Sequence, residues 1–146
     1  MTLVGMAMAD TPTVYLVSCV GKKLDRAACA KDLYDSTLFR LARHYVERQQ
    51  GVWFILSARY GLVAPDQRIE PYDQTLNNMK VAERRAWAHR VQQQMDAGFQ
   101  SGGRCVVLAG NRYREFLMDY LSKRFTTEVP MDGLRIGEQQ RWLLDN

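Results

Sequence analysis

Short apolar runs and amphipathic stretches alternate along this chain. The apolar runs are typical of buried strands, and they predict strands over Thr13–Ser18, Val52–Ser57, Cys105–Ala109 and Thr126–Val129. The stretches that follow them show the helical period, and they predict helices over residues 35–50, 81–97, 112–124 and 137–144. Strands separated by helices favour right-handed βαβ units. The pattern therefore predicts an α/β fold, a three-layer Rossmann-like domain with a small, mostly parallel four-stranded sheet.

The length of 146 residues is enough for one hydrophobic core and short for two. Residues 1–12 are mildly apolar and lack the basic region of a signal peptide, so they are expected to form a loose leader before a single domain over residues 13–146. Two connections, 19–34 and 58–80, are longer than usual. Long connections in compact domains are commonly binding loops.

The composition is that of an ordinary globular protein, with 47% hydrophobic and 25% charged residues. No apolar run approaches the roughly 20 residues that span a bilayer, so no membrane partner is expected. Cys19, Cys29 and Cys105 form no CxxC or Cys/His cluster, which favours reduced thiols in the cytoplasm and no metal site. The net charge of +4 fits either a polyanionic partner or a solvated mixed surface.

The run that ends in Ser57 continues into a cation, an aromatic residue and a glycine. Ligands of parallel sheets bind outside the carboxyl ends of the strands, so this is a candidate site. Ser57 offers a catalytic hydroxyl, Arg59 a planar fork for phosphate, Tyr60 a ring for stacking, and Gly61 a backbone free to adopt positive φ. The alternative is a plain turn with Arg59 exposed and Tyr60 packed.

Two other strand ends share this composition. Ser18 and Cys19 precede Lys22 and Lys23, and Gly110 follows the third apolar run; these five residues are candidate ligand contacts for phosphate or carboxylate. Cys19 is either a nucleophile or simply buried, and the lysines either bind a ligand or are solvated.

Three further positions complete the candidate site. Tyr72 is a second stacking ring, and Asp73 is a candidate general base or stabiliser of an oxocarbenium-like centre. Alternatively, Asp73 caps a turn. Arg135, close to Gly133 ahead of the last helix, is another candidate anion ligand. The Walker A and GxGxxG patterns are absent, so no nucleotide cofactor is expected.

Several of these segments together match a known pattern. They are Val17–Cys19 with Lys22 and Lys23, Leu33–Phe39, Leu56–Val63, Pro71–Leu76 and Gly133–Gln139. They resemble a family of uncharacterised bacterial and phage domains that is sometimes described as similar to the peroxide-stress protein YaaA. The resemblance implies an α/β fold and a nucleic-acid or nucleobase context. A stress-response or phage-defence setting belongs to the non-enzymatic alternatives given below.

Cations, tyrosines and one nearby carboxylate favour an enzyme that processes a nucleotide or a nucleic-acid base. The expected reaction is at an N-glycosidic bond, by a hydrolase or transferase without metal. In this hypothesis phosphate is held by Lys22, Lys23, Arg59 and Arg135, the base by Tyr60 and Tyr72, and the reacting sugar by Asp73. Two alternatives stay open: a non-enzymatic DNA- or RNA-binding protein, and a sensor of small nucleotides.

Overall fold

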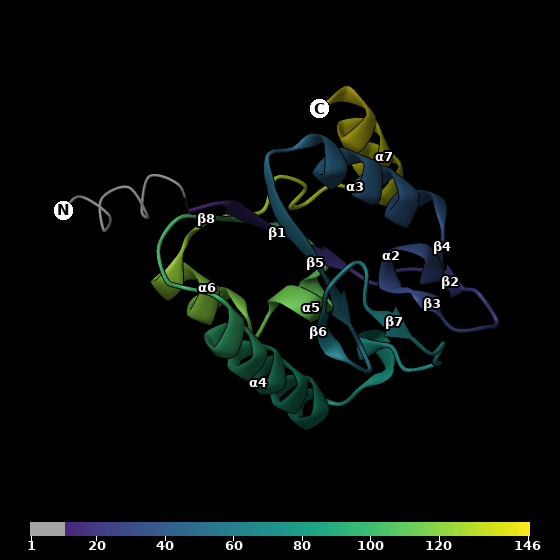
Figure 1. The fold of residues 1–146 in the computed structure, drawn as a ribbon, viewed down its shortest axis with the longest axis horizontal. Helices are drawn as coiled ribbons and strands as arrows, with labels where there is room; N and C mark the ends of the chain where they lie inside the picture. Colours follow the sequence, from purple (N-terminus) through teal and green to yellow (C-terminus); the bar gives the residue numbers. More distant parts are fainter. Residues whose placement is uncertain (1–10) are drawn as a thin grey trace.

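A five-stranded sheet with the order β6-β5-β1-β8-β9 forms the centre of the computed structural model (Figure 1), which describes residues 11–146. Its strands are β1 (Thr13–Ser18), β5 (Gly51–Ser57), β6 (Gly61–Val63), β8 (Arg104–Leu108) and β9 (Thr126–Glu128). β1 pairs in parallel with β5 and β8, and β8 pairs in parallel with β9. The mixed α/β class and the mostly parallel sheet are therefore confirmed. Residues 1–10 of the expected leader lie outside the described residues.

The prediction of four strands is wrong, because β6 adds a fifth at one edge of the sheet. After Ser57 the chain turns over three residues and pairs Gly61–Val63 antiparallel with Ile55–Ser57. Gly61 has φ of 75°, which a residue with a Cβ rarely adopts. A three-residue strand is too short for an alternating pattern to be recognised in the sequence.

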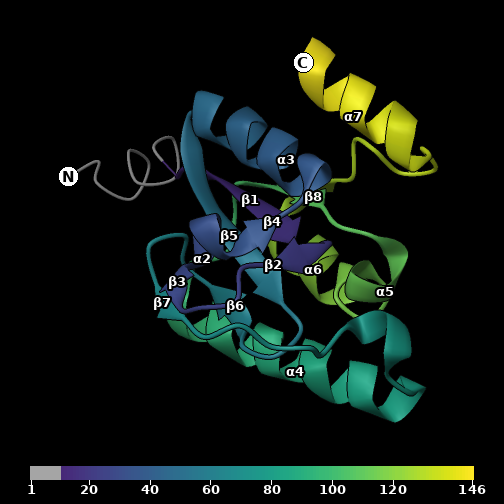
Figure 2. The ribbon, with the colours of Figure 1, turned by 90° about the vertical axis from the view of Figure 1, so that its right-hand side faces the viewer.

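Six α-helices are found within residues 11–146. They are α2 (Ala30–Leu33), α3 (Thr37–Arg48), α4 (Val81–Gly98), α5 (Asn111–Arg114), α6 (Met118–Arg124) and α7 (Ile136–Asp145), and a 3-10 helix, η1, spans Leu76–Asn78. α3 and α7 pack together on one side of the sheet, while α4, α5 and α6 lie on the other side (Figure 2). α3 begins as predicted, because the Ser36 hydroxyl accepts a hydrogen bond of 3.2 Å from Phe39 N.

The single helix predicted over residues 112–124 is instead divided into α5 and α6. Leu117 N bonds to Arg114 O, a tighter i→i+3 turn than that of an α-helix. The Glu115 carboxylate in this turn accepts a hydrogen bond of 2.5 Å from the buried Arg84 guanidinium. The break is thus fixed by a tertiary contact with α4.

Both long connections contain structure of their own. β2 (Lys22–Lys23) pairs with β4 (Tyr34–Asp35), and β3 (Ala28–Cys29) pairs with β7 (Arg68–Ile69). Because β3 belongs to the connection after β1 and β7 to the connection after β5, this second ladder joins the two. The loops above the carboxyl edge therefore form one assembly.

The strand order reverses between β1 and β8. From β1 the chain passes to β5 on one side, and from β8 it passes to β9 on the other. Neighbouring strands that send their connections in opposite directions leave a crevice at their carboxyl ends, where α/β proteins bind ligands. Here that crevice follows the pair Val17 and Leu108.

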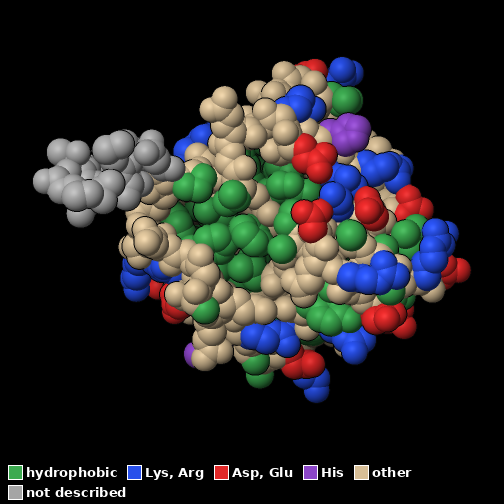
Figure 3. Space-filling view, in the orientation of Figure 1, with side chains coloured by type: hydrophobic (Ala, Val, Ile, Leu, Met, Phe, Trp, Pro, Cys, Tyr) green, Lys and Arg blue, Asp and Glu red, His purple; other side chains and the backbone are tan. Residues whose placement is uncertain are grey.

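β6 covers only half of β5. It pairs with Ile55–Ser57, and Val52 at the start of β5 is exposed. Apolar side chains gather in a hollow on this face (Figure 3), where Val14, Val52, Phe99 and Phe125 line a cavity of about 370 Å³. The apolar hollow lies at the amino end of the parallel strands, away from the crevice. Within residues 11–146, none of the helices is both long and apolar enough to cross a bilayer.

Candidate functional site

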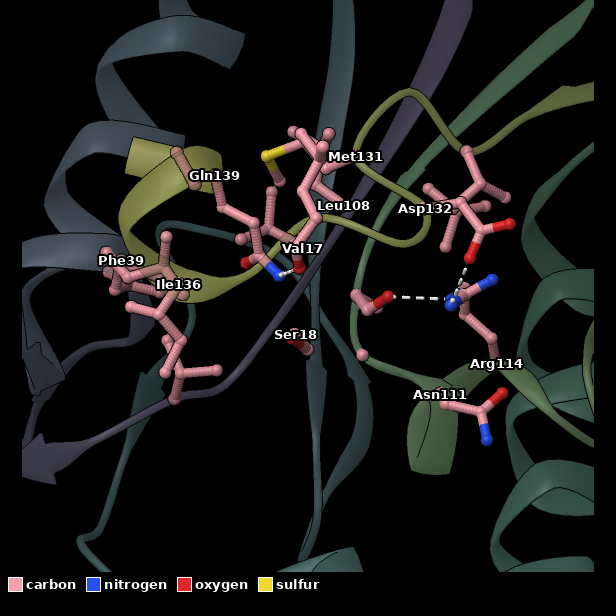
Figure 4. A pocket seen from close by; sticks show the side chains of 18 of the residues that line it. Val17, Ser18, Phe39, Leu108, Asn111, Arg114, Met131, Asp132, Ile136 and Gln139 are labelled. Carbon is pink, nitrogen blue, oxygen red and sulfur yellow. Dashed lines mark hydrogen bonds and ion pairs between the residues drawn. The ribbon is translucent and has the colours of Figure 1, made fainter. Parts of the chain in front are cut away.

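A cavity of about 380 Å³ lies at the crevice between β1 and β8, and we call it the switch-point cavity (Figure 4). Val17 and Leu108 form its floor, and Phe39 and Ile136 bring apolar side chains from α3 and α7 to one side. The opposite side carries Asn111, Arg114 and Asp132. The cavity is therefore apolar with a polar rim, which is the usual make-up of a small-molecule site.

Ser18 ends β1 at this cavity and is only 4% exposed. Its side chain has no hydrogen-bond partner among residues 11–146. Every fully shielded side-chain nitrogen or oxygen of the described residues does have a partner, so the Ser18 hydroxyl keeps a small exposed area, and the residue lines both this cavity and the one next to it. Buried hydroxyls are nearly always hydrogen-bonded. An almost buried, unpartnered hydroxyl in a cavity points to a ligand.

Three further cavities follow the switch-point cavity along the carboxyl edge. The first, of about 370 Å³, shares Ser18, Gly110 and Asn111 with it and adds Arg112. The second, of about 240 Å³, is lined by Cys19, Val20, Gly21, Lys23, Gln74, Thr75, Asn77 and Tyr113, and the third, of about 560 Å³, by Gly21, Lys22, Lys23, Leu24, Asp25, Pro71, Tyr72 and Asp73. Successive cavities share residues, so they form one continuous depression, here called the edge groove.

Ser57 lies beneath this groove and is fully buried. Its Oγ donates a hydrogen bond of 2.8 Å to the Tyr72 hydroxyl and accepts one of 3.1 Å from Tyr60 N. The Tyr72 and Tyr34 hydroxyls are 2.7 Å apart. Burial raises the pKa of both phenols far above the usual value of 10.0. Ser57 is thus the inner end of a chain of neutral hydroxyls.

The two tyrosine rings of this chain support Lys23. Its Nζ lies 4.5 Å from the Tyr72 ring centroid and 5.8 Å from that of Tyr34, within range of a cation–π interaction. Tyr72 is 7% exposed and also packs edge-on against Tyr60. Its face is therefore occupied by Lys23 and is not open to a stacking base. Lys23, by contrast, is a fixed cation at the wall of the groove.

Cys19 lines the middle of the groove. Its Sγ lies 3.3 Å from the Tyr113 hydroxyl, and the thiol is buried. Burial raises the pKa of Tyr113 above its usual value, so this hydroxyl is a neutral partner and not a base. The cysteine is placed for contact with a ligand, but no activating base adjoins it in the described contacts.

The remaining predicted residues lie apart from the groove. Arg59, Tyr60 and Gly61 form the β5–β6 turn against α4, where Arg90 Nη2 donates to Arg59 O at 2.7 Å and Gln94 Oε1 accepts from Leu62 N at 2.8 Å. Arg135 is the exposed N-cap of α7. None of these four predicted residues lines a cavity described above. The structure therefore brings together Ser18, Cys19, Lys22, Lys23, Tyr72, Asp73 and Gly110.

The sequence profile of a family of unknown function, DUF6884, matches residues 14–145. The chain belongs to this family. No curated protein and no solved structure matches the chain. Membership of an uncharacterised domain family is thus confirmed, and the similarity to YaaA stays a prediction. The DUF6884 match takes in every residue that lines the edge groove.

Sequence reasoning missed one polar pair at the rim of the switch-point cavity. Arg114 donates from Nε to Ala109 O at 2.9 Å and from Nη2 to Asp132 at 3.1 Å (Figure 4). The two side chains come from α5 and from the segment after β9, so no local spacing joins them. Asn111 also lines the cavity and directly follows the predicted residue Gly110, but a single amide side chain belongs to no recognisable motif.

Proposed function

We propose that this chain is an enzyme that binds a nucleotide along the edge groove and acts on its N-glycosidic bond. The unpartnered Ser18 hydroxyl at the β1–β8 crevice carries the proposal, because it supports a polar ligand at this point. Ser18, Gly110 and Asn111 lie together there, with the Arg112 guanidinium beside them. A phosphate group suits this combination of hydroxyl, amide and guanidinium donors.

From the phosphate, the rest of the nucleotide follows the groove. The sugar passes over Cys19 and Thr75, and the base reaches the wider end between Lys23 and Pro71. Lys22 and Lys23 at that end donate hydrogen bonds to the carbonyl oxygens of the base. This direction brings the Asp73 carboxylate next to the bond between sugar and base.

Three cations without an ion pair supply positive charge to the groove. Ion pairs occupy many of the chain's cations, namely Arg26, Lys31, Arg40, Arg43, Arg84, Arg104, Arg114, Lys123 and Arg124. Lysine and arginine side chains are interspersed with acidic ones on the face in Figure 3. Lys22, Lys23 and Arg112 take part in none of the ion pairs among residues 11–146, and all three line the groove. Three of the eleven lysine and arginine side chains that have no ion pair among residues 11–146 therefore line the groove and are available to a ligand there.

The chemistry follows from two groups at the wide end of the groove. Asp73 takes a proton from a water molecule whose oxygen then bonds to the anomeric carbon, and its negative charge stabilises the oxocarbenium-like transition state. The bond between the anomeric carbon and the base nitrogen breaks, and its electron pair leaves with the base. Lys23 donates a hydrogen bond to the departing base, and the proton that Asp73 took from water passes to the base nitrogen, which restores the carboxylate. With a hydroxyl acceptor in place of water, the same step is a transfer.

Release of free base from a panel of nucleoside 5′-monophosphates, followed by chromatography, tests this function. We expect base release by the wild type and a loss of about a hundredfold or more in Asp73→Asn. Glu70→Gln is the matched control, because Glu70 is an exposed acid three residues away that lines none of the groove cavities. Full activity of Asp73→Asn would exclude the mechanism. Binding of polynucleotides with a steep salt dependence and no base release would favour a DNA- or RNA-binding protein instead.

A further inference from the structure

The switch-point cavity is left unoccupied by a mononucleotide placed in this way. The phosphate lies at Ser18, Gly110 and Asn111, and these residues are the boundary that the cavity shares with the groove. The groove runs from this boundary in one direction, and the cavity extends from it in the other. A bound phosphate would therefore lie between the polar edge groove and the apolar switch-point cavity.

The cavity has the size and walls of a site for a flat apolar ring. Its volume of about 380 Å³ is within the range of small-molecule pockets. Phe39 and Ile136 lie on one side (Figure 4), and Met131 and Leu108 add further apolar side chains to the lining. Asn111 and Gln139 supply amide groups at the edges; Gln139 Nε2 donates a hydrogen bond of 2.9 Å to Leu134 O, which leaves Gln139 Oε1 as an acceptor for the hydrogen-bonding rim of a heterocycle.

The charge at the junction also limits the kind of phosphate. Arg114 is paired with Asp132, which leaves Arg112 as the cation of this part of the groove that has no ion pair among the described residues. A terminal phosphate carries a charge of about −1.5 to −2 at neutral pH, whereas a phosphate linked on both sides carries a single negative charge. The single positive charge of the Arg112 guanidinium therefore matches the single negative charge of a phosphate that is linked on both sides.

We infer, on the basis of the proposed function, that the substrate is a phosphodiester whose second substituent enters the switch-point cavity. The linking phosphate lies at Ser18 and Asn111, the nucleoside that reacts occupies the edge groove, and a second base fills the cavity between α3 and α7. The substrate class is then a dinucleotide, or the end of a longer strand. A nucleoside 5′-monophosphate fills only half of the site.

Titrations with dinucleoside monophosphates and with nucleoside 5′-monophosphates of the same base test this inference. Ile136→Trp and Gln139→Trp place a ring into the cavity from two positions of α7, so the outcome does not depend on one rotamer. Leu144→Trp is the matched control. Leu144 lies on the same helix and is 63% exposed, close to the 65% of Ile136, but it does not line the cavity. Thermal unfolding of each variant establishes that it is folded.

We expect the wild type to bind the dinucleotide at least about tenfold more tightly, because the second base is buried in the cavity. The two cavity variants should lose this preference and keep their affinity for the monophosphate, while Leu144→Trp keeps both. Equal affinities in the wild type, or an unchanged preference in both cavity variants, would overturn the inference and leave the proposed function intact. Tight dinucleotide binding without release of base would overturn the function and leave the cavity assignment intact. Failure to bind either compound would overturn both.

Discussion

Two neighbouring strands, β1 and β5, end in a buried serine, and the two serines have opposite surroundings. Ser57 is fully enclosed and bonds to Tyr72 and to the Tyr60 backbone. Ser18 is almost as deeply buried, yet its hydroxyl has no partner within residues 11–146 and lies at a cavity. The two serines are therefore alike in burial and differ in hydrogen bonding.

The two strand ends look alike in the sequence but differ in their contacts. The β5 end is a structural anchor, since its hydroxyl chain supports the rings of Tyr72 and Tyr34 beneath Lys23. The β1 end has a hydroxyl without a partner among the described residues, which is the donor and acceptor of the proposed ligand site. The Ser57 hydroxyl, for which a catalytic role was predicted, is fully buried and has no access to the groove. Its contacts fit a role in positioning Lys23 through Tyr72.

The largest expected effect separates the two serines by stability. Ser57→Ala should lower the free energy of unfolding by about 1–3 kcal/mol, because the Tyr60 amide and the Tyr72 hydroxyl would lose a buried partner. Ser18→Ala should change it by less than about 0.5 kcal/mol, since no bond within the described residues is lost. Urea denaturation of the two variants measures both values. Equal losses would mean that Ser18 has a structural partner after all.

The turn after β5 should be nearly as sensitive. Gly61→Ala is expected to cost about 1–2 kcal/mol in the free energy of unfolding, because its φ is 75° and a Cβ would overlap the Gln94 side chain. Gly98→Ala is the control, because a Cβ at the last residue of α4 meets no atom within 4 Å. This control should be neutral or stabilising by up to about 1 kcal/mol. A tolerated Gly61→Ala would contradict the role of the turn in forming β6.

Alkaline pH tests the neutral hydroxyl chain. Burial raises the pKa of Tyr34 and Tyr72 above 10.0 in the folded state, so above that pH the unfolded chain loses protons that the folded chain keeps. Stability should be constant with respect to these groups below pH 10 and should fall as the pH rises further. Tyr34→Phe/Tyr72→Phe should show a shallower decline in thermal unfolding between pH 9 and 11 (about one unit either side of that value). An equally steep decline would place the titrating groups elsewhere.

The smallest effect is expected at a cation outside the groove. Arg59→Gln should leave nucleotide affinity within about twofold of the wild type, as an exposed charge away from the ligand contributes little. Arg112→Gln should weaken binding by about tenfold, because it removes a charged hydrogen bond. Calorimetric titration compares them. A larger loss in Arg59→Gln would return the β5 end to the binding site.

Much of this arrangement could be predicted from the sequence, and the reason lies in local patterns. The apolar runs located β1, β5, β8 and β9, and the glycine and serine after them located the carboxyl edge. The partner of each serine could not be predicted. Tyr72 reaches Ser57 from a connection that the ladder between β3 and β7 folds back over the sheet.

The switch-point cavity escaped prediction for a related reason. Phe39, Met131 and Ile136 come from three elements that meet only when α7 packs on α3. In the sequence each is an ordinary apolar residue that no motif sets apart. The division of the last long helix into α5 and α6 likewise depends on Arg84, which is distant in the sequence.

An NMR titration of ¹⁵N-labelled protein with dinucleoside monophosphates and nucleoside 5′-monophosphates tests the central claim most directly. If the β1 end holds a ligand and the β5 end is an anchor, the amides of Ser18, Gly110 and Asn111 shift with added nucleotide. Ser18→Ala should then weaken binding by about tenfold. Shifts confined to Arg59–Gly61 or to the apolar hollow at the start of β5, with Ser18→Ala binding as tightly as the wild type, would contradict the account.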